Sequence, residues 1–512
     1  MQPLGRRTAG LVLKILLLAL TTSILGFMAF FALLAGEWLV GGVILLIIVF
    51  ANWIYFSKKS VAAKFFFPGT VFLIIFMLLP IAYTGFMSTQ NYKTGNLISK
   101  EEAIEQLQIV GLTPSESGIT YDMVLGNYQG KVAALLTNQL DGTVYLGVSK
   151  KLTSLEPGTF EVNEFNVAQT TPGFQVVDIE NDPNAETIIA DLVFPLPDGS
   201  FISAQGFDLA AEMIETYRYN AANNTLEDIS TGFVWVDNGN GNFVNPDDAE
   251  DKLYPGWRAF NPGQNFIGLF TDPRLSGPFL SVFIWTLTFS VITVASMFFV
   301  GLLLAVALDK KIRGRNLYRA LLILPYAMPS FMSILIWAGM FNRDIGVFNA
   351  ILGTQIDWLN DPWIARGALL LVNLWLGFPY FYLIATGALQ ALPSDMEEAA
   401  AIDGATAPQI FWRIKLPLVL EILGPLLIAS LAFNFNNFNL VYLLTRGGPT
   451  NVIEGESAGA TDILITYAYK TAFSGAEQNF GLASAISVIV FVIVGALSLW
   501  SLRQSRALEN VK

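Results

Sequence analysis

Residues 398–404 read Glu-Ala-Ala-Ala-Ile-Asp-Gly, and nine residues later the chain continues Ile414-Lys415-Leu416-Pro417. This stretch lies between two apolar segments that are each long enough to cross a bilayer. Small alanine side chains allow the close approach of another surface, while the carboxylates keep the stretch soluble. An Ala-rich solvated loop with no partner is the alternative. The spacing from Glu398 through Gly404 to Ile414 and Pro417, between two spans, favours a docking element.

Local signals around this stretch predict two short helices. Ser394 and Glu397 match a capping box just after Pro393, so a helix should start there and stop at Gly404. A second helix should begin with Thr406 as its cap and Pro408 in its first turn, and should end near Pro417 as the chain re-enters the membrane. We therefore expect a helix-turn-helix held out from the membrane.

The composition is that of a membrane protein. Charged residues make up only 14% of the 512 residues, against about 25% in average proteins, and the mean hydropathy is +0.52. The chain contains neither Cys nor His, which excludes disulfides and thiolate metal sites and removes the usual general base. It also has no G-x-x-x-x-G-K-[ST] motif. We expect no enzyme activity and no cofactor in this chain, so any ATP must be hydrolysed by a partner.

Eight apolar runs predict a polytopic α-helical membrane protein with an inserted β-rich domain. The chain then divides into three transmembrane helices in 1–92, a hydrophilic domain in 93–275, and a core of five helices in 276–512 that includes the loop at 393–417. The expected spans are 15–36, 38–57, 65–92, 275–308, 320–341, 367–392, 418–445 and 478–502.

The distribution of charge predicts the orientation of these spans. Residues 91–275 carry 26 acidic and 9 basic side chains, whereas the rest of the chain has 15 and 20. Eight crossings from a cytoplasmic N-terminus place every basic cluster inside, and leave the acidic domain outside. These clusters are Arg6/Arg7, Lys58/Lys59/Lys64, Lys310/Lys311/Arg313/Arg315/Arg319 and Arg503/Arg506. We expect a multi-pass membrane protein with both termini cytoplasmic, and no basic patch for nucleic acid.

The domain at 93–275 has the alternation of apolar and polar residues that is typical of strands, for example in 143–148 and 159–163. Ser99 and Glu102 form a capping box for a short helix. The Asp/Asn/Gly cluster at 237–242 resembles a calcium loop, but Gly239 stands where an oxygen ligand is needed. We expect a hairpin turn there instead.

Polar residues inside three of the later spans need a protein-lined or wet cavity. At 100° per residue, Phe433, Asn434 and Asn437 fall within about a 100° arc. In the span 367–392, one face carries Asn373, Leu376, Gly377 and Tyr380, and in the span 320–341 Tyr326 and Ser330 lie one turn apart. Amides, hydroxyls and aromatic faces without charge suit a neutral sugar. We expect Asn436 and Asn439, which point elsewhere, to form interhelical hydrogen bonds.

From about Pro278 onward the chain resembles the MalF family, the larger membrane subunits of bacterial maltose importers. The resemblance lies in residues 324–331 (LPYAMPSF), 372–380 (VNLWLGFPY), 432–438 (AFNFNNF) and 446–449 (RGGP). It includes the loop at 393–417, which is similar to the coupling loop by which such subunits contact their ATPase. It implies a sugar site at Tyr326, Ser330, Asn373, Leu376, Gly377, Tyr380, Phe433, Asn434 and Asn437. It also implies contact with the ATPase through Glu398, Ala399, Ala400, Asp403, Gly404, Ile414, Leu416 and Pro417. Leu374 and Phe378 depart from the familiar pattern and are expected to retune sugar preference.

The same resemblance implies a set of partners and a substrate. These are a MalG-like second permease subunit, two MalK-like ATPase subunits that bind ATP and Mg, a periplasmic sugar-binding protein, membrane lipid, and maltose or maltodextrin. A permease for another neutral oligosaccharide, such as trehalose or a cyclodextrin, is an alternative within the class. A membrane receptor would also explain the outer domain, but the longest cytoplasmic segment is too short for an output domain. A channel would leave the coupling loop without a purpose.

Overall fold

The computed structural model describes residues 4–57, 61–115, 117–177, 185–309, 313–450, 458–474 and 477–509. Lys58, Lys59, Lys310 and Lys311, which were expected on the cytoplasmic side, lie outside the described residues. The chain forms two compact units, Met1–Met87 and Ser88–Lys512, and each is described by itself.

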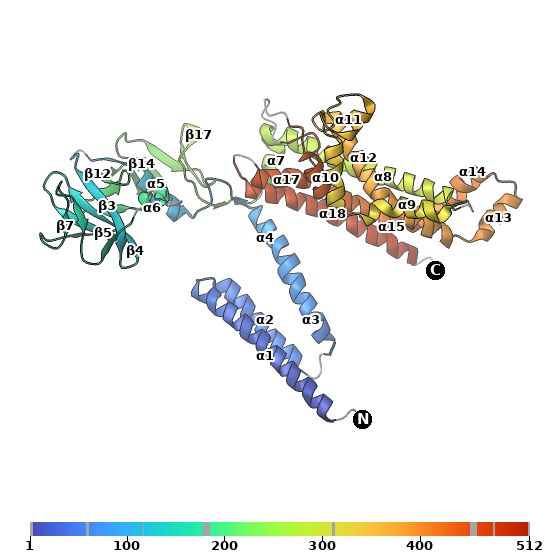
Figure 1. Ribbon diagram of the computed structural model, residues 1–512, viewed down its shortest axis with the longest axis horizontal. Coiled ribbons are helices and arrows are strands. Elements are labelled where there is room, and N and C mark those ends of the chain that lie inside the picture. Colours follow the sequence, from blue (N-terminus) through green and yellow to red (C-terminus); the bar gives the residue numbers. More distant parts are fainter. Residues whose placement is uncertain are drawn as a thin grey trace. The chain divides into compact units, whose positions relative to one another are not determined.

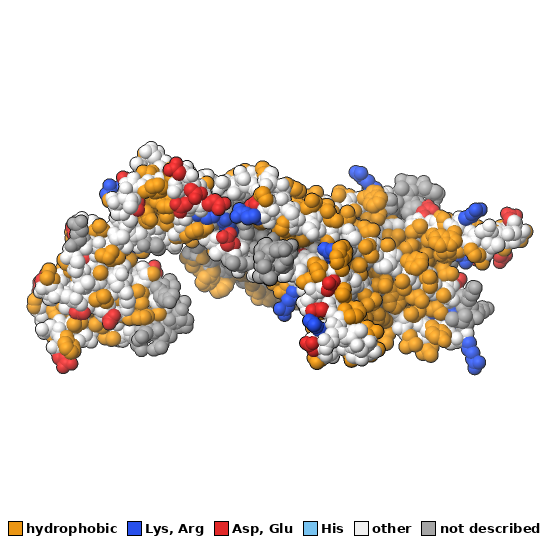
Figure 2. Space-filling view, turned by 90° about the horizontal axis from the view of Figure 1, so that it is seen from above, with side chains coloured by type: hydrophobic (Ala, Val, Ile, Leu, Met, Phe, Trp, Pro, Cys, Tyr) orange, Lys and Arg blue, Asp and Glu red, His pale blue; other side chains and the backbone are white. Residues whose placement is uncertain are grey.

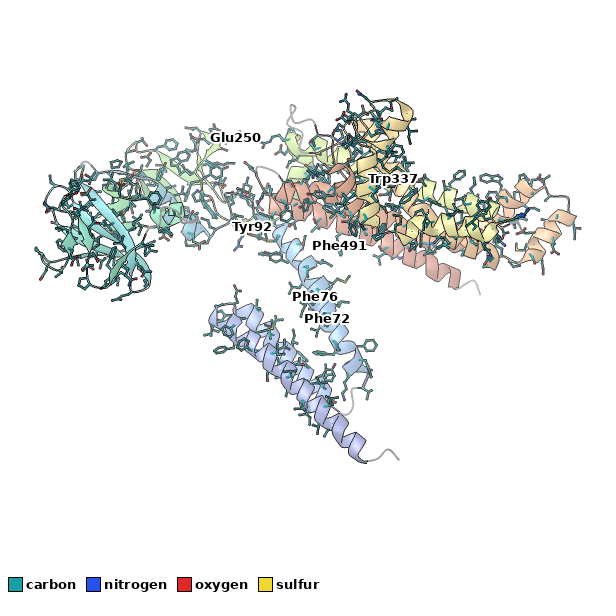
Figure 3. All side chains as sticks on the ribbon, viewed as in Figure 1. Phe72, Phe76, Tyr92, Glu250, Trp337 and Phe491 are labelled. Carbon is teal, nitrogen blue, oxygen red and sulfur yellow. The ribbon has the colours of Figure 1, made fainter. Side chains whose placement is uncertain are left out.

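The first unit is entirely helical (Figure 1). Its elements are α1 (Leu4–Leu34), α2 (Trp38–Phe56), α3 (Val61–Leu73), the π-helical turn η1 (Ile74–Leu78) and α4 (Leu79–Met87). Gly36 has a φ of +79° in the tight turn between α1 and α2, a conformation that glycine adopts without steric cost. Asn52 Nδ2 donates to Thr22 Oγ1 at 3.0 Å and joins the two helices. The rings of Phe72 and Phe76 stack on one side of α3 and η1 (Figure 3).

The β-rich part of the second unit contains two main antiparallel sheets. One has nine strands in the order β10-β11-β12-β3-β4-β5-β6, with β2 paired to β12 and β9 to β3, and the other is the meander β13-β14-β15-β16-β17. Their cores contain Leu136, Phe194 and Ile202 in the first sheet, and Leu226 and Phe243 in the second. Buried residues alternate with others in β3, as the period of two requires.

The strands and short helices of this part have the following bounds: β1 (Gln90–Asn91), α5 (Lys100–Val110), β2 (Leu112–Pro114), β3 (Thr120–Tyr128), β4 (Lys131–Asn138), β5 (Val144–Val148), β6 (Lys151–Ser154), β7 (Glu161–Val162), β8 (Ala168–Thr170), β9 (Phe174–Val176), α6 (Ala185–Ala190), β10 (Val193–Pro195), β11 (Phe201–Ala204), β12 (Leu209–Glu215), β13 (Tyr217–Asn220), β14 (Thr225–Asp228), β15 (Val234–Asp237), β16 (Phe243–Asn245), β17 (Asp248–Lys252) and β18 (Ala259–Phe260).

Two local predictions for this part are confirmed. Ser99 caps α5: its backbone N–H donates to Glu102 Oε2, and its Oγ accepts from the Glu102 N–H. The cluster at 237–242 is the turn between the paired strands β15 and β16. Asp237 forms an ion pair with Lys100 at 2.7 Å rather than facing outward as a ligand.

The helical part of the second unit begins with α7 (Gln264–Thr271) and has these further elements: α8 (Pro273–Ala307), α9 (Arg315–Ala327), α10 (Ser330–Met340), α11 (Val347–Leu352), α12 (Pro362–Ala391), α13 (Ser394–Ile402), α14 (Ala407–Ile410), η2 (Phe411–Lys415), α15 (Leu416–Phe435), α16 (Phe438–Thr445), α17 (Leu464–Phe473) and α18 (Phe480–Glu509). Apolar side chains cover this part on the face seen in Figure 2, whereas polar atoms predominate over the strands. Trp337 of α10 packs with Phe341, Phe348 and Trp375 (Figure 3).

Six helices in the described residues are long and apolar enough to cross a membrane, and a bent pair adds a seventh candidate. The six lie in Gly10–Leu34, Val61–Met87, Pro273–Ala307, Pro362–Ala391, Ala407–Phe435 and Phe480–Ser501. The remaining predicted run, 38–57, corresponds to a shorter apolar helix, Val40–Phe56.

Two predicted spans are not single helices. The segment 320–341 is α9 and α10, which meet at 92°, because Pro329 cannot donate the backbone hydrogen bond that would continue α9. The segment 418–445 breaks at Asn436 and Asn437, where α15 ends and the Asn437 side chain caps α16. Polar groups beside both breaks line the cavity that is described below.

The coupling segment differs from its prediction in two details. Ser394 makes no capping bond, because Pro393 is the N-cap and Ser394 is already helical; Glu397 bonds Lys415 instead. The second helix does not end near Pro417, since α14, η2 and α15 run on continuously from Ala407 to Phe435. The π turn of η2 widens the helix just before Pro417, which accommodates a residue without an N–H.

Candidate functional site

A cavity of about 620 Å³ lies within the helical part of the second unit. This volume is in the usual range of ligand sites. Its walls come from α8, the α9–α10 bend, α12, α15 and α16. The lining residues are Met297, Pro325, Tyr326, Met328, Ser330, Ile334, Asn373, Leu376, Gly377, Tyr380, Phe381, Ala429, Ser430, Phe433, Asn434, Asn437, Asn439 and Leu440.

Helix breaks and one close contact shape this cavity. The α9–α10 bend places Tyr326 before the break and Ser330 after it, on the same wall. α12 runs unbroken through Gly377 and Pro379. A Cβ on Gly377 would lie 2.2 Å from Met297 Cε, so any larger residue here would displace the Met297 side chain of α8 from its present contact with α12.

Three asparagines join the helices at the cavity wall, and we call Asn373, Asn434 and Asn437 the amide triad. Asn373 Nδ2 donates to Asn434 Oδ1 at 2.8 Å, and Asn437 Nδ2 donates to Asn373 Oδ1 at 3.4 Å. Asn434 Nδ2 donates to the carbonyl oxygen of Ser430 at 2.9 Å. Asn373 and Asn434 are each only 3% exposed. The triad therefore fixes α12, α15 and α16 to one another.

All nine residues predicted for the sugar site lie together in the cavity wall. Their role in binding remains a prediction. The interhelical bonds expected of Asn436 and Asn439 are made instead by the amide triad, because helix α15 ends at Phe435 and the next residues leave its periodicity. Asn436 is exposed at the end of α15, and Asn439 lines the cavity.

Sequence reasoning missed several cavity residues, among them Met297 and Ser430. Ser430 lies one helical turn before Asn434, so a search of the whole α15 face would have found it. Met297 gives no such signal, since its place depends on the contact with Gly377. Leu374 and Phe378 are not among the cavity-lining residues, so the structure gives them no direct part in sugar preference.

The cavity has the chemistry of a site for a neutral polyhydroxylated ligand. The described residues that line it include no Asp, Glu, Lys or Arg. Tyr326, Tyr380 and Phe433 supply aromatic faces, and amides and hydroxyls supply donors and acceptors.

Comparison with known proteins decides the family. The model of the binding-protein-dependent transport system inner membrane component matches residues 297–505, and that of the N-terminal part of the TM subunit in PBP-dependent ABC transporters matches residues 71–150. The maltose/maltodextrin transport system permease protein MalF of Vibrio vulnificus is 36% identical over 476 residues, which cover 90% of this chain and 88% of the relative. MalF of Escherichia coli K12 is 34% identical over 506 residues, or 96% of each chain.

The chain belongs to the MalF family of permease proteins. Among solved structures, a bacterial alginate ABC transporter in complex with an alginate-bound periplasmic protein matches 48% of this chain and 83% of its own, at 21% identity and a TM-score of 0.41.

The coupling segment of this MalF-family chain is an exposed hairpin at one end of the helices (Figure 1). Glu398, Ala399, Ala400 and Asp403 come from α13 or its C-cap, and Ile414, Leu416 and Pro417 from η2 and α15. Gly404 has a φ of +85° in the turn between them. Thr406 N–H donates to Gln409 Oε1 at 2.7 Å, which confirms Thr406 as the cap of the second helix. Ile402 is an apolar residue of this hairpin and is 85% exposed.

A buried ion pair, which sequence reasoning missed, joins Asp462 to Lys470 of α17. Asp462 has no exposed surface and accepts hydrogen bonds from Gly459 N–H, Thr466 Oγ1 and Lys470 Nζ, the last at 2.7 Å. Burial raises the pKa of the Asp462 carboxyl, and the Lys470 ammonium opposes that rise. A Cβ on Gly447 would lie 1.7 Å from Asp462 Oδ1, so the Arg-Gly-Gly-Pro turn packs directly on this carboxylate.

Proposed function

We propose that this chain is the permease subunit of an ABC importer that moves maltose and maltodextrins across the inner membrane. The uncharged cavity carries the proposal: it combines amides, hydroxyls and aromatic faces in about 620 Å³ between helices. Its relatives named as maltose/maltodextrin permeases support the choice of sugar. The nine predicted residues, from Tyr326 to Asn437, would contact the sugar.

The mechanism that fits this arrangement is alternating access. A loaded periplasmic binding protein docks on the outer domain, and ATP closes two MalK-like subunits that grip the α13 hairpin. A MalG-like subunit completes the translocation path, and membrane lipid surrounds the helices. Closure rotates the core helices and opens the cavity outward, sugar transfers, and hydrolysis resets the cavity inward. ATP and Mg act in the partners, and this chain makes no covalent change.

The orientation and domain division follow the charge pattern. The N- and C-termini are cytoplasmic, and residues 93–275 are periplasmic. Domains 1–92, 93–275 and 276–512 would then be the N-terminal helices, the outer domain and the core. A reporter fused after Gly130 should be outside; a cytoplasmic reporter would contradict this topology.

The deciding experiment is ATPase activity of the complex reconstituted in nanodiscs. The complex would contain this chain, its second permease subunit and the ATPase, with binding protein added empty or loaded with maltose. Strong stimulation only by the maltose-loaded protein is expected. Stimulation only by binding protein loaded with another neutral sugar, such as trehalose, would keep the mechanism and change the substrate. Failure to assemble with any ATPase would favour a receptor.

A further inference from the structure

The root of the outer domain is joined to the start of α18 by backbone hydrogen bonds, and we call residues 88–98 the stem. Thr94 N–H donates to the Gln478 carbonyl oxygen at 2.9 Å, and Gly481 N–H donates to that of Tyr92 at 3.0 Å. Between these bonds, Lys93 and Asn479 are antiparallel bridge partners. The stem is therefore paired with the chain that leads into α18, like a short strand.

Side chains strengthen this junction. The rings of Tyr92 and Phe480 have centroids 5.4 Å apart, and Tyr92 lies near the base of the outer domain in Figure 3. Asn265 Nδ2 donates to the carbonyl oxygens of Ser88 and Gln90, both at 2.9 Å, and so ties the stem to α7. A Cβ on Gly481 would lie 2.2 Å from the Gln90 carbonyl oxygen, so the stem and α18 are in direct backbone contact.

The stem is joined just as closely to the outer domain itself. Asn96 has no exposed surface, and its Nδ2 lies 2.8 Å from the Gly241 carbonyl oxygen and 3.0 Å from Asn242 Oδ1. Trp257 N–H also donates to the Gly241 carbonyl oxygen, at 2.7 Å. The turn at 237–242 is thus the point at which the five-stranded sheet is attached to the stem.

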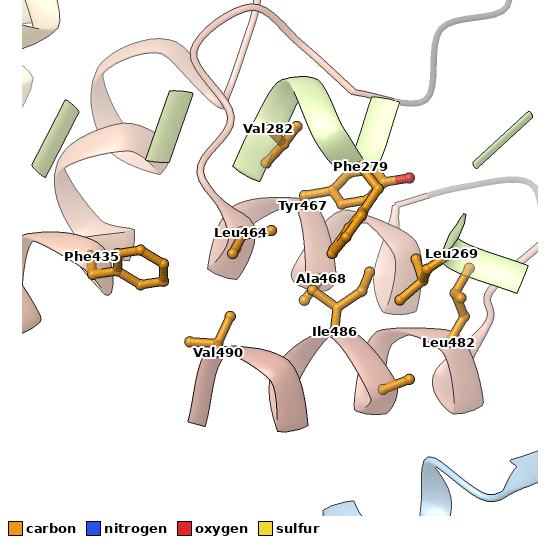
Figure 4. Packing of buried hydrophobic residues seen from close by; sticks show 11 residues of the cluster. Leu269, Phe279, Val282, Phe435, Leu464, Tyr467, Ala468, Leu482, Ile486 and Val490 are labelled. Atoms are coloured by element: carbon orange, nitrogen blue, oxygen red, sulfur yellow. The ribbon is translucent and has the colours of Figure 1, made fainter. Parts of the chain in front are cut away.

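From α18 the contacts continue to the cavity. Ile486 and Val490 of α18 belong to one buried cluster with Phe435, the last residue of α15 (Figure 4). Phe435 is 1% exposed and directly follows Asn434 of the amide triad. A displacement of α18 would therefore reach the cavity wall through packed side chains.

We propose that the stem and α18 form one rigid element, which carries movement of the outer domain to the cavity. Asn96, Asn265 and Gly481 are its positioning residues. The proposal rests on the proposed function, because it presupposes that a partner docks on the outer domain. A flexible hinge at the stem is the opposite arrangement, in which the outer domain would only hold its partner near the core.

Locking and breaking the junction distinguish the two arrangements. The chain has no Cys, so the double variant Thr94→Cys with Gln478→Cys introduces its only thiols. The two residues lie opposite each other, beside the Lys93–Asn479 bridge. Residues paired in this way are close enough to form a disulfide. After oxidation, the complex should keep at least half of its stimulation by loaded binding protein. Loss of stimulation on oxidation, absent in the two single-Cys variants, would overturn the proposal.

Gly481→Ala breaks the same junction by steric contact. We expect stimulation by loaded binding protein to fall about tenfold, while basal ATPase activity and assembly are unchanged. Gly495→Ala is the matched control, because it lies on the same helix and an added Cβ there meets no described atom within 4 Å. Normal stimulation of the Gly481→Ala complex would overturn the proposal.

Hydrogen exchange tests rigidity without transport. The Thr94 and Gly481 amides should exchange as slowly as that of Ile486 in the assembled complex, and Gly481→Ala should speed the first two by at least tenfold. Fast exchange of both in the unaltered chain would overturn the rigid element and leave the proposed function intact. If the Thr94 and Gly481 amides exchange slowly but no loaded binding protein stimulates the ATPase activity of the complex, the result would count against the proposed function and not against the rigid element.

Discussion

Lys415 Nζ lies 2.6 Å from Glu397 Oε1, and this ion pair closes the coupling hairpin between α13 and η2. The two side chains are 19% and 37% exposed, so solvent screens the pair only in part. Such a pair is worth about 1 kcal/mol or less. The pair fixes the angle between the two arms of the hairpin, and under the proposed function that angle would set how the hairpin meets the ATPase subunit.

Breaking this ion pair should lower the efficiency of coupling more than the stability of the protein. In Glu397→Gln, we expect sugar transported per ATP hydrolysed to fall severalfold, while the complex still assembles. The exchange Glu397→Lys with Lys415→Glu should restore part of the loss. Asp395→Asn, on the same helix but without an ion pair among the described residues, serves as the control. Equal coupling ratios in Glu397→Gln and Asp395→Asn would contradict this role.

Gly404→Val should uncouple transport from ATP hydrolysis. A φ of +85° costs a non-glycine residue about 1–3 kcal/mol, so the turn would shift and misplace α13. Gly353→Val is a control for backbone strain, because Gly353 has a φ of +64° far from the hairpin and open space around it. Transport and ATPase activity measured on one proteoliposome sample give the ratio. An unchanged ratio in Gly404→Val would show that the turn tolerates the strain.

Asn437→Ala should reduce sugar transport at least tenfold in a complex that assembles normally. The side chain lines the cavity and donates to Asn373, so its loss removes a donor at the wall. Asn436→Ala changes the neighbouring exposed amide, which is not among the cavity-lining residues, and should transport normally. Equal transport by the two variants would place the sugar site elsewhere.

Lys470→Met should destabilise the complex in a pH-dependent manner. It leaves the buried Asp462 carboxylate without its cation, which costs about 3–5 kcal/mol. Without the ammonium the pKa of Asp462 rises further, so its protonated form is favoured in the fold. A raised folded pKa gives stability that is present at low pH and lost as pH rises through that pKa. The variant should therefore be more stable near pH 5.5 than near pH 8, measured as the thermal midpoint of the assembled complex.

Adding Asp462→Asn to Lys470→Met should remove this pH dependence and restore much of the stability, because no charge is then buried. Arg274→Met breaks an ion pair with Asp272 in which the arginine side chain is 80% exposed, and should change the midpoint little. A Lys470→Met complex with the same midpoint at both pH values would contradict a raised pKa of the Asp462 carboxyl in this variant.

The apolar runs predict the helices well because length and hydropathy alone decide whether a segment can cross a bilayer. Their breaks are less predictable. Pro325 and Pro329 signal an irregularity, but the 92° bend depends on packing around α10. The end of α15 at Phe435 has no proline or glycine signal, and it depends on the Asn437 cap and the amide triad.

The candidate site, like the fold, is predictable from the sequence only in part. Helical periodicity identifies which residues share a face, and all nine predicted residues line the cavity. It cannot show that Asn373 and Asn434 bond each other, because that depends on the crossing of two helices. Periodicity also cannot identify the Asp462–Lys470 ion pair, which is notable only because the Asp462 side chain is fully buried. Ser394 was predicted to be the N-cap of α13, but the helix begins one residue earlier, with Pro393 as its N-cap.

The amide triad has a consequence for how firmly a ligand is held. In this conformation Asn373, Asn434 and Asn437 already bond one another. A polyhydroxylated molecule that entered the cavity would therefore exchange some of these bonds for its own, and the net gain from each exchange would be small. The same bonds hold the wall together without a ligand, so the cavity keeps its shape when it is empty.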